Sequence, residues 1–239
     1  MSGKRQKEAR RQVDRERVYA PLEAMRLMKG LDTAKFDETV EVHIRTGLNV
    51  RHAEQQLRGT ISLPHGLGKE MTVAVFAKGD KAREAEEAGA DVVGGEDLVE
   101  RVMKGDIDFE AAVATPDMMA AVGKAGRVLG PRGLMPNPKT GTVTNDIAKA
   151  VADIKGGKIE YKTDRTGNVH AIIGKKSFST DQLLANYLAV VDEVLRAKPN
   201  AAKGTYVKTA AISTTMGPGI RLDTHRLKDT DSQPQPAAV

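Results

Sequence analysis

The sequence predicts two domains, an α+β domain assembled from both ends of the chain and an α/β domain inserted into it. Buried strands alternate with helices from residue 72 to residue 115, which is the order of a parallel sheet covered by helices on both faces. Before and after this block, strands alternate between polar and apolar residues, as in an antiparallel sheet with one face in water. A chain of 239 residues is long enough for two such domains.

The central block consists of short elements, several of which end at glycine. Residues 72–77 (TVAVFA) form an apolar run typical of a strand that is buried on both faces. Helices are predicted over residues 81–89 and 96–105, because each segment stops at a glycine. Further strands are predicted over residues 91–95 and 109–115. Pro116 then opens another helix, in whose first turn a proline is tolerated.

The flanking segments have a different pattern. Residues 38–46 alternate between apolar and polar side chains, which predicts a strand with one wet face. Residues 158–175 indicate two strands joined by a turn at Asp164–Gly167. Strand character resumes over residues 204–215. Between them, a long helix is predicted over residues 178–199, with an apolar face near Leu183, Leu184, Leu188, Val191 and Leu195.

Glycines gather at the two junctions between these patterns, in LPHGLGK (63–69) and KGGK (155–158). The junctions predict a split domain at residues 1–65 and 158–228, an inserted domain at 66–157 and a disordered tail at 229–239. Because glycine tolerates backbone rotation, a two-strand hinge is expected there. Its residues are Pro64, Gly66, Gly68, Gly156 and Gly157. Alternatively, both segments are ordinary loops of a single domain.

Charge divides along the chain in the same way. The net charge is +5 for residues 1–30, −1 for 31–64, −3 for 65–157 and +4 for 158–239. A basic surface attracts polyanions, of which nucleic acid is the commonest in the cytoplasm. The simpler alternative is that the basic ends only keep the protein soluble.

Several classes of function are disfavoured by residues that the chain lacks. It has no cysteine and its five histidines are scattered, so no metal site is predicted. The glycine-rich segment 123–143 does not open a helix directly after a strand, and GKKS (174–177) has Val169 where a phosphate-binding loop needs glycine. No cofactor, small-molecule substrate or enzymatic activity is therefore expected. Without a membrane-spanning run or a signal peptide, the protein is expected in the cytoplasm, with no membrane partner.

The loop STTMGPG (213–219) is the remaining candidate for binding. With 3% aromatic residues and no tryptophan, base stacking is not expected as the main mode. Threonine hydroxyls and glycine amides suit the phosphates and 2′-hydroxyls of folded RNA, and methionine adapts to a sugar or base. The alternative is a plain strand, turn and strand with Met216 buried. The following IRLD is expected to do no more than hold the loop on the sheet.

Seven segments carry a resemblance to a known family. In order over about residues 30–223, they are AKFDETVEVHIR, LPHGLGK, EEAGADVVGGEDL, FEAAVATPDMM, VLGPRGLMPNPKTGTV, KIEYKTDRTGNVHA and STTMGPGIRLD. Together they resemble the L-one family of bacterial large-subunit ribosomal proteins, the proteins of the mobile stalk. The match is specific, because the glycine-proline segment and the threonine-methionine-glycine loop are long and unusual. The first thirty residues are less distinctive, and the tail from His225 departs from the pattern.

The resemblance implies a fold and a function. The fold is a split antiparallel α+β domain with an inserted Rossmann-like three-layer αβα domain, joined by a hinge. The split domain binds a junction-like fold in large-subunit (23S) rRNA, as part of the large ribosomal subunit, and the stalk contacts exit-site tRNA and assists its release. The family also represses translation by binding a similar fold in its own operon mRNA. The Rossmann-like domain does not imply an enzyme.

The resemblance also implies three groups of RNA-binding residues. They are Lys35, Phe36, Thr39 and Glu41; Lys162, Thr166, Gly167 and His170; and Thr209, Ser213, Thr215, Met216, Gly217 and Pro218. Because Glu41 would repel a phosphate, it is expected to accept a hydrogen bond from a 2′-hydroxyl or base amine, or to orient a neighbour. Alternatively, Phe36 belongs to the core, and Lys162 and His170 are solvated strand residues.

Two other classes of function stay open on the sequence alone. One is a small-molecule enzyme built on the central block, which tight, saturable nucleotide binding would identify. The other is a protein-interaction module that uses the split domain, which purification with a stoichiometric protein and without RNA would identify. Neither accounts for the division of charge as directly as RNA binding does.

Overall fold

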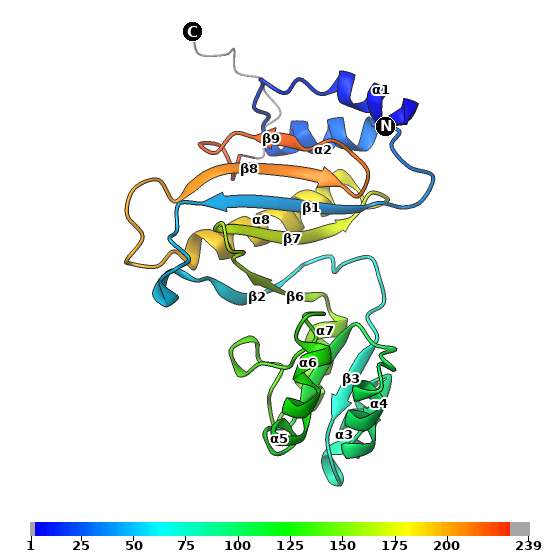
Figure 1. Cartoon of the computed structure of the whole chain (residues 1–239). Coiled ribbons are helices and arrows are strands. Elements are labelled where there is room, and N and C mark those ends of the chain that lie inside the picture. The colour runs from blue at the N-terminus through cyan, green and yellow to red at the C-terminus, as the bar shows by residue number, and fades with distance from the viewer. Residues whose placement is uncertain (1–2, 230–239) are drawn as a thin grey trace. The chain divides into compact units, whose positions relative to one another are not determined.

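The computed structural model of the chain describes residues 3–229, which form two compact units (Figure 1). The split unit joins the residues up to Gly68 to those from Tyr161 onward, and the inserted unit is Lys69–Glu160. The predicted fold class, an antiparallel α+β part with an inserted three-layer α/β part, is confirmed. The predicted disordered tail lies, apart from Asp229, outside the described residues.

The split unit is built on a four-stranded antiparallel sheet in the order β7-β1-β8-β9. The N-terminal part of the chain supplies the central strand β1, whose two neighbours both come from the C-terminal part. The strands are β1 (Thr39–Thr46), β7 (Asn168–Lys175), β8 (Val207–Thr214) and β9 (Ile220–Leu222). The sheet therefore forms only when both ends of the chain meet.

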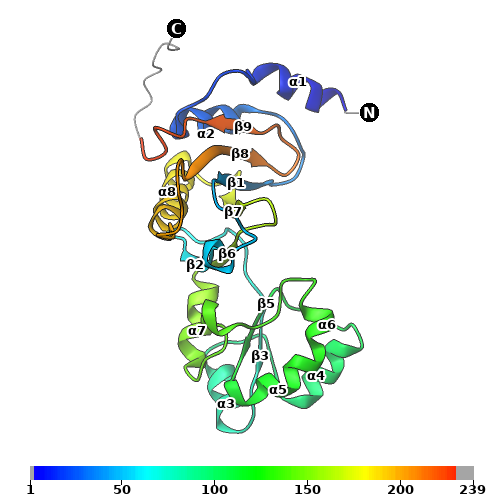
Figure 2. The same ribbon diagram turned by 60° about the vertical axis from the view of Figure 1, so that its left-hand side comes forward.

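Helices α2 (Pro21–Gly30) and α8 (Thr180–Arg196) cover one face of this sheet, and Figure 2 shows α8 lying against it. The alternation predicted for residues 38–46 is confirmed, because Val40, Val42 and Ile44 are at most 1% exposed. Helix α8 begins with a capping box, in which Ser179 and Gln182 each bond the backbone N–H of the other. Within residues 3–229, no helix covers the opposite face of the sheet.

The buried stripe of α8 differs in detail from the prediction. Leu183 and Val191 are buried as expected, but three predicted leucines lie beside the stripe and are half-buried: Leu184, Leu188 and Leu195. The stripe is completed by Asn186, Tyr187, Val190 and Val194, which are buried. Residues 183, 187, 190 and 194 recur every three or four positions, which is the spacing of a single helix face.

The split unit also contains shorter elements: α1 (Lys4–Gln12), η1 (Ala53–Gln55), β2 (Arg58–Ser62) and β6 (Lys158–Lys162), whose first residues belong to the inserted unit. The predicted turn joins β6 to β7, but these strands belong to different sheets. β6 pairs with β2, and a single bridge between Thr163 and Val169 links it to β7. In residues 3–229, no helix has the length and apolar character needed to cross a membrane.

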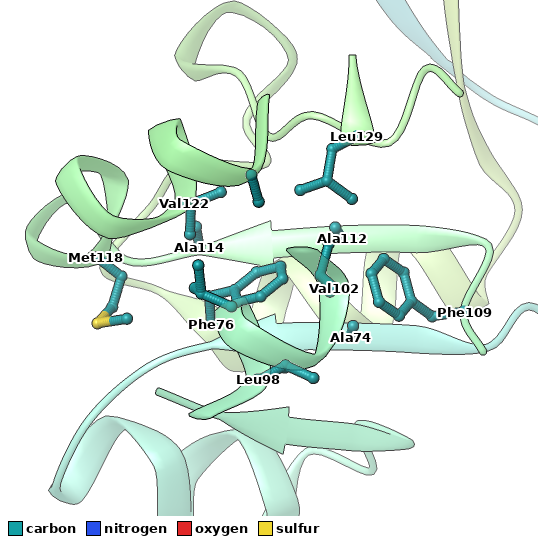
Figure 3. Packing of buried hydrophobic residues seen from close by; sticks show 12 residues of the cluster. Ala74, Phe76, Leu98, Val102, Phe109, Ala112, Ala114, Met118, Val122 and Leu129 are labelled. Atoms are coloured by element: carbon teal, nitrogen blue, oxygen red, sulfur yellow. The ribbon is translucent and has the colours of Figure 1, made fainter. Parts of the chain in front are cut away.

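The inserted unit contains a parallel three-stranded sheet in the order β4-β3-β5, covered by helices on both faces as predicted. Helices α3 and α7 cover one face, and α4, α5 and α6 cover the other, which Figure 3 shows with Phe76 near its centre. The rings of Phe76 and Phe109 meet edge to face, with centroids 6.2 Å apart. The elements are β3 (Val73–Phe76), α3 (Asp80–Glu87), β4 (Val92–Gly94), α4 (Glu96–Met103), β5 (Ala111–Ala114), α5 (Met119–Val122), α6 (Gly126–Leu129) and α7 (Ile147–Lys155).

The glycine-proline segment 123–143 pairs with the edge strand β5 of this sheet. The helix predicted from Pro116 is divided into short helices, with η2 (Pro116–Met118), η3 (Gly123–Ala125) and η4 (Pro138–Thr140) beside α5 and α6. The segment then returns to β5, where the Ala114 N–H donates to the Thr142 carbonyl at 2.9 Å. Leu134 and Met135 pack against the core. The many glycines and prolines thus belong to a compact connection with its own packing.

Candidate nucleic-acid interface

The uncovered face of the four-stranded sheet, which we call the open face, is mostly polar. The strand register places side chains in rows across it. Glu41 lies opposite Ile172 on β7 and Ser213 on β8. A neighbouring row runs through His170, His43, Ala211 and Arg221. Residues from both ends of the chain therefore form one continuous surface.

The loop after β8 is bonded to the start of β1. The Thr215 N–H donates to the Thr39 carbonyl at 3.1 Å, and the Thr39 N–H donates to the Thr215 hydroxyl at 3.1 Å. The Met216 N–H donates to a carboxylate oxygen of Glu38 at 2.8 Å. The backbone of the loop is thus held while the Met216 side chain stays 49% exposed. The alternative in which Met216 is buried is wrong.

Glu38 is the buried centre of these bonds, with no exposed side-chain surface. Its second carboxylate oxygen accepts a hydrogen bond from the Thr33 hydroxyl and lies 3.6 Å from the Lys176 ammonium. Burial raises the pKa of the Glu38 carboxyl. The hydrogen bonds from Thr33, Met216 and Thr214, together with the Lys176 charge, outweigh burial and lower that pKa below its ordinary value. An ionised carboxylate therefore holds the loop.

Gly217 is required by a close approach. A Cβ atom at this position would lie 2.3 Å from the hydroxyl oxygen of Thr214, well inside van der Waals contact. The Gly217 N–H donates to the Thr214 carbonyl at 3.1 Å, which closes the turn. Ile220 and Leu222 are buried on β9, so the prediction that IRLD holds the loop on the sheet is right for these two residues.

Exposed apolar side chains lie on the open face, on the loop after β8 and in the segment that leads into β1. Phe36 is 57% exposed, so the alternative that places it in the core is wrong. Ile172 is 39% exposed on the open face beside Glu41. Together with Met216, these side chains offer apolar contact to a ligand whose surface alternates between charged and apolar groups. A nucleic acid has such a surface, since its sugars and bases lie between phosphates.

The structure brings only part of the predicted site together. Near the loop end of the sheet lie Lys35, Phe36, Thr39, Glu41, Ser213, Thr215, Met216, Gly217 and Pro218. Thr166, Gly167 and Thr209 lie at the other end of β1, about 20 Å away at the usual rise of a strand. His170 stands between the two groups. Lys162 belongs to β6 in the separate two-stranded sheet, and Gly167 is buried, its carbonyl accepting bonds from Thr46.

The turn before β7 is organised by Asp164. Its carboxylate accepts hydrogen bonds from the backbone N–H groups of Thr166 and Asn168, each at 2.8 Å, and from both side chains. Burial raises the pKa of this carboxyl, but the hydrogen bonds from Asn168 and Thr166 outweigh it and hold the pKa far below its usual range. The Thr166 hydroxyl is thereby occupied within the turn. Thr166 is exposed, but it is less free to bind RNA than the sequence predicts.

Two histidines meet at the centre of the open face. Nδ1 of His43 lies 2.8 Å from Nδ1 of His170, and Nε2 of His43 lies 3.0 Å from the Ser213 hydroxyl. Burial and the neighbouring His170 lower the pKa of His43, and the Glu41 carboxylate 3.8 Å away only partly opposes this. One nitrogen of the Nδ1 pair has to accept the bond, so both rings cannot carry a proton there.

This arrangement predicts that the split unit loses stability as the pH falls below 6.5, the ordinary pKa of histidine. The unfolded chain binds a proton at His43 more readily than the folded chain does, so unfolding is favoured until the pH has passed the folded pKa. His170, Ser213, Glu41 and Asp164 are the groups that face the pair. All four tyrosines lie in the split unit and the chain has no tryptophan, so tyrosine fluorescence follows this unit alone.

Urea unfolding at pH 7.5 and pH 5.5 measures the effect. We expect His43→Gln to reduce the difference between the two pH values. His52→Gln, at an exposed histidine of the same unit, should leave it unchanged. An equal pH dependence in wild type and His43→Gln would contradict the prediction.

Four residues of this site were not predicted: His43, Arg45 and Arg221 on the open face, and the buried Glu38 that holds the loop. The strict alternation over residues 38–46 places His43 and Arg45 on the same wet face as Glu41, so this signal could have found both. Arg221 alternates with buried Ile220 and Leu222, and the same rule applies. No pattern marks Glu38, because its partners Met216 and Lys176 are distant in the sequence.

The residues of the expected hinge occupy two loops. Gly66, Gly68 and Gly157 have φ values of 63°, 69° and 93°, in the region that favours glycine. Gly66 is also held by the buried side chain of Asn186, which donates to its carbonyl at 3.0 Å. Gly156 and Gly157 follow the last turn of α7 and bond back to it. Among residues 3–229, no three histidine, aspartate or glutamate side chains are grouped to hold a metal ion.

Comparison with known proteins identifies the family of this chain. The model of the family described as "Ribosomal protein L1p/L10e family" matches residues 27–218. The protein named "Large ribosomal subunit protein uL1" of Streptomyces sp. (strain FRI-5) is 60% identical over 229 residues, which cover 95% of each chain. Proteins of the same name from Thermobifida fusca (93% of this chain, 95% of the relative) and Saccharopolyspora erythraea (91% of each) are also 60% identical. The chain belongs to the ribosomal protein L1p/L10e family.

Proposed function

We propose that this protein is a structural, non-enzymatic constituent of the large ribosomal subunit that binds large-subunit (23S) rRNA through the open face and the Thr215–Gly217 loop. Family membership and the names of the relatives support the ribosomal role and a place on the ribosome in the bacterial cytoplasm. The charge of the split unit's chain segments supports a polyanionic ligand.

The observation that carries the RNA proposal is the loop whose backbone is held by β1 while its Met216 side chain is exposed. Because Glu38 and Thr39 hold the loop in place, little conformational entropy is lost when RNA binds. An exposed methionine buries apolar surface against a sugar or base without requiring one geometry. Hydroxyl and backbone groups around it suit phosphates and 2′-hydroxyls.

Finer roles follow from the same surface. We propose that the protein forms the mobile stalk that contacts exit-site tRNA and assists its release, with a hinge at Pro64–Gly68 and Gly156–Gly157 between the two units. We also propose that it represses translation by binding its own operon mRNA. If one surface serves both RNAs, rRNA and mRNA compete for it, and a variant that loses one loses the other in parallel.

Met216→Ala tests the loop. Burying a methionine side chain contributes about 1.5–3 kcal/mol, so we expect the affinity for purified large-subunit rRNA to fall about tenfold or more. The matched control is Met103→Ala, because Met103 is 52% exposed in the inserted unit. Filter binding gives the affinity. Urea unfolding should stay within about 0.5 kcal/mol of wild type for the Met216 variant.

The outcomes are distinct. Wild-type affinity in Met216→Ala would exclude the side chain from the interface. Loss of stability in proportion to loss of affinity would assign Met216 a structural role instead. Binding should also weaken with salt, by a logarithmic slope of about −0.7 to −0.9 per phosphate neutralised. A salt-independent interaction would indicate a protein ligand.

A further inference from the structure

A groove of about 350 Å³ lies beside the Thr215–Gly217 loop, between it and the end of α1. The loop and β9 supply Gly217, Pro218, Gly219 and Arg221, and the N-terminal segment supplies Arg10, Val13, Asp14 and Arg15. The first thirty residues, which carry a net charge of +5, have no role in the proposed loop contact. The groove brings Arg10 and Arg15 of this segment next to that loop.

The fold holds the N-terminal segment in place. Ala9 and Val13 are 2% and 5% exposed, so α1 is packed against the unit at its C-terminal end. The backbone of Tyr19 donates to the Arg221 carbonyl at 2.9 Å and accepts from the Asp223 N–H at 3.0 Å. The groove is therefore a feature of the folded unit, formed by a held segment and a strand.

Three arginines of the groove are available to a ligand. Arg10, Arg15 and Arg221 are exposed, and none of them forms an ion pair within residues 3–229. Two neighbouring arginines of the same segment are engaged, Arg5 with Asp32 at 3.7 Å and Arg17 with Glu23 at 2.6 Å. Among the described residues that line the groove, Asp14 is the one carboxylate, and it accepts a hydrogen bond from the Glu16 N–H at 2.9 Å. The groove therefore has a net positive charge.

We propose that Arg10, Arg15 and Arg221 bind phosphates of the RNA strand where it continues past the Thr215–Gly217 loop. This inference rests on the proposed function and extends it to a second contact. RNA accounts for the groove better than an acidic protein segment does, because Gly217 and Pro218 line the groove and belong to the proposed RNA loop. Arg221 also continues the open-face row that contains His43. Because glycine and proline have small side chains, the RNA backbone can approach the guanidinium groups. Guanidinium groups pair well with phosphate.

The test is the triple variant Arg10→Gln, Arg15→Gln, Arg221→Gln in the full chain, with purified large-subunit rRNA as the probe. If each arginine neutralises one phosphate, the logarithmic salt slope should fall by about 2–3 in magnitude, and affinity at low salt by about tenfold or more. The matched control removes three exposed arginines of the inserted unit, Arg83→Gln, Arg127→Gln, Arg132→Gln. This control variant has the same net charge as the groove variant and should keep the salt slope of wild type. Tyrosine fluorescence in urea confirms that the split unit is folded.

Each outcome decides the inference. Unchanged affinity and slope in the groove variant would overturn it and point to an acidic protein segment as the ligand. The proposed function would still stand if Met216→Ala weakens binding. An equal loss in the control variant would also overturn the inference, because net charge alone would then explain the effect. If the wild-type chain itself does not bind the rRNA, both the proposed function and the inference fail.

Discussion

Replacing Glu38 with alanine is expected to destabilise the split unit by about 3–5 kcal/mol, which is the usual cost of removing one partner from a buried charged network. The change leaves the Met216 N–H and the Thr33 hydroxyl without their acceptor. It also leaves Lys176, whose side chain is 19% exposed, without its carboxylate. The loop after β8 should then lose its position, so rRNA affinity should fall together with stability.

Two further variants separate the causes. Glu38→Gln keeps an acceptor for the Met216 N–H but removes the charge opposite Lys176. The stability of this variant should therefore lie between that of Glu38→Ala and that of wild type. Glu54→Ala removes an exposed carboxylate of the same unit and should stay within about 0.5 kcal/mol of wild type. Urea unfolding followed by tyrosine fluorescence measures all three. Equal stability of Glu38→Ala and Glu54→Ala would refute the role of Glu38.

The Glu38 contribution also depends on pH. Because the pKa of Glu38 is lowered in the folded chain, the stabilisation is complete above the ordinary value of 4.5 and is lost as the pH falls through the folded-state pKa. The Glu38 effect therefore begins at a lower pH than the His43 effect, which begins at 6.5. In Glu38→Gln the loss of stability at acidic pH should be smaller than in wild type.

The second large effect is expected at Asn186, a fully buried amide on α8. Its carbonyl accepts from the His65 N–H at 3.0 Å, and its amide group donates to the carbonyls of Gly66 and Ile173 at 3.0 and 2.8 Å. Asn186→Leu keeps the branched shape of asparagine but replaces its amide oxygen and nitrogen by larger methyl groups, and it leaves three backbone groups unpaired. Since each unpaired buried group costs about 1–3 kcal/mol, we expect a loss of about 3 kcal/mol or more.

Amide hydrogen exchange adds a local measurement to urea unfolding. The His65 amide should exchange much faster in Asn186→Leu, because its only described acceptor is the Asn186 side chain. Asn200→Leu, at an exposed asparagine of the same unit, is the control and should change neither exchange at His65 nor stability by more than about 0.5 kcal/mol. Unaltered protection of His65 in Asn186→Leu would show that this bond does not hold the segment.

Local sequence patterns were sufficient to predict most of the fold. The alternation over residues 38–46 correctly predicted which face of β1 is buried, and Gly89 and Gly105 marked the ends of α3 and α4 to within two residues. The pairing of β6 with β2 had no local signal, since hydrophobic alternation does not say which strand is the neighbour. The predicted fold class needed only the order of the elements.

The candidate site was predictable only in part. Met216 and Phe36 had two possible environments in the sequence, and their exposure in the folded chain decides between them. Asn186 and Glu38 could not be recognised because polar residues are buried only where distant groups complete their hydrogen bonds. The His65 amide is 121 residues from Asn186, and Met216 is 178 residues from Glu38. Contacts of Met216 and Phe36 with RNA stay a prediction.

The position of β1 between β7 and β8 governs the order in which the protein can fold during its synthesis. Its last residue, Thr46, is followed by the whole inserted unit before β7 begins at Asn168. At the usual speed of about 5–20 residues per second, a newly made β1 waits on the order of ten seconds for its first neighbour. The inserted unit can complete its core during this time, whereas the edges of β1 stay unpaired. A chain that stops before Val207 would keep one of these edges open, and it would be prone to aggregate through it.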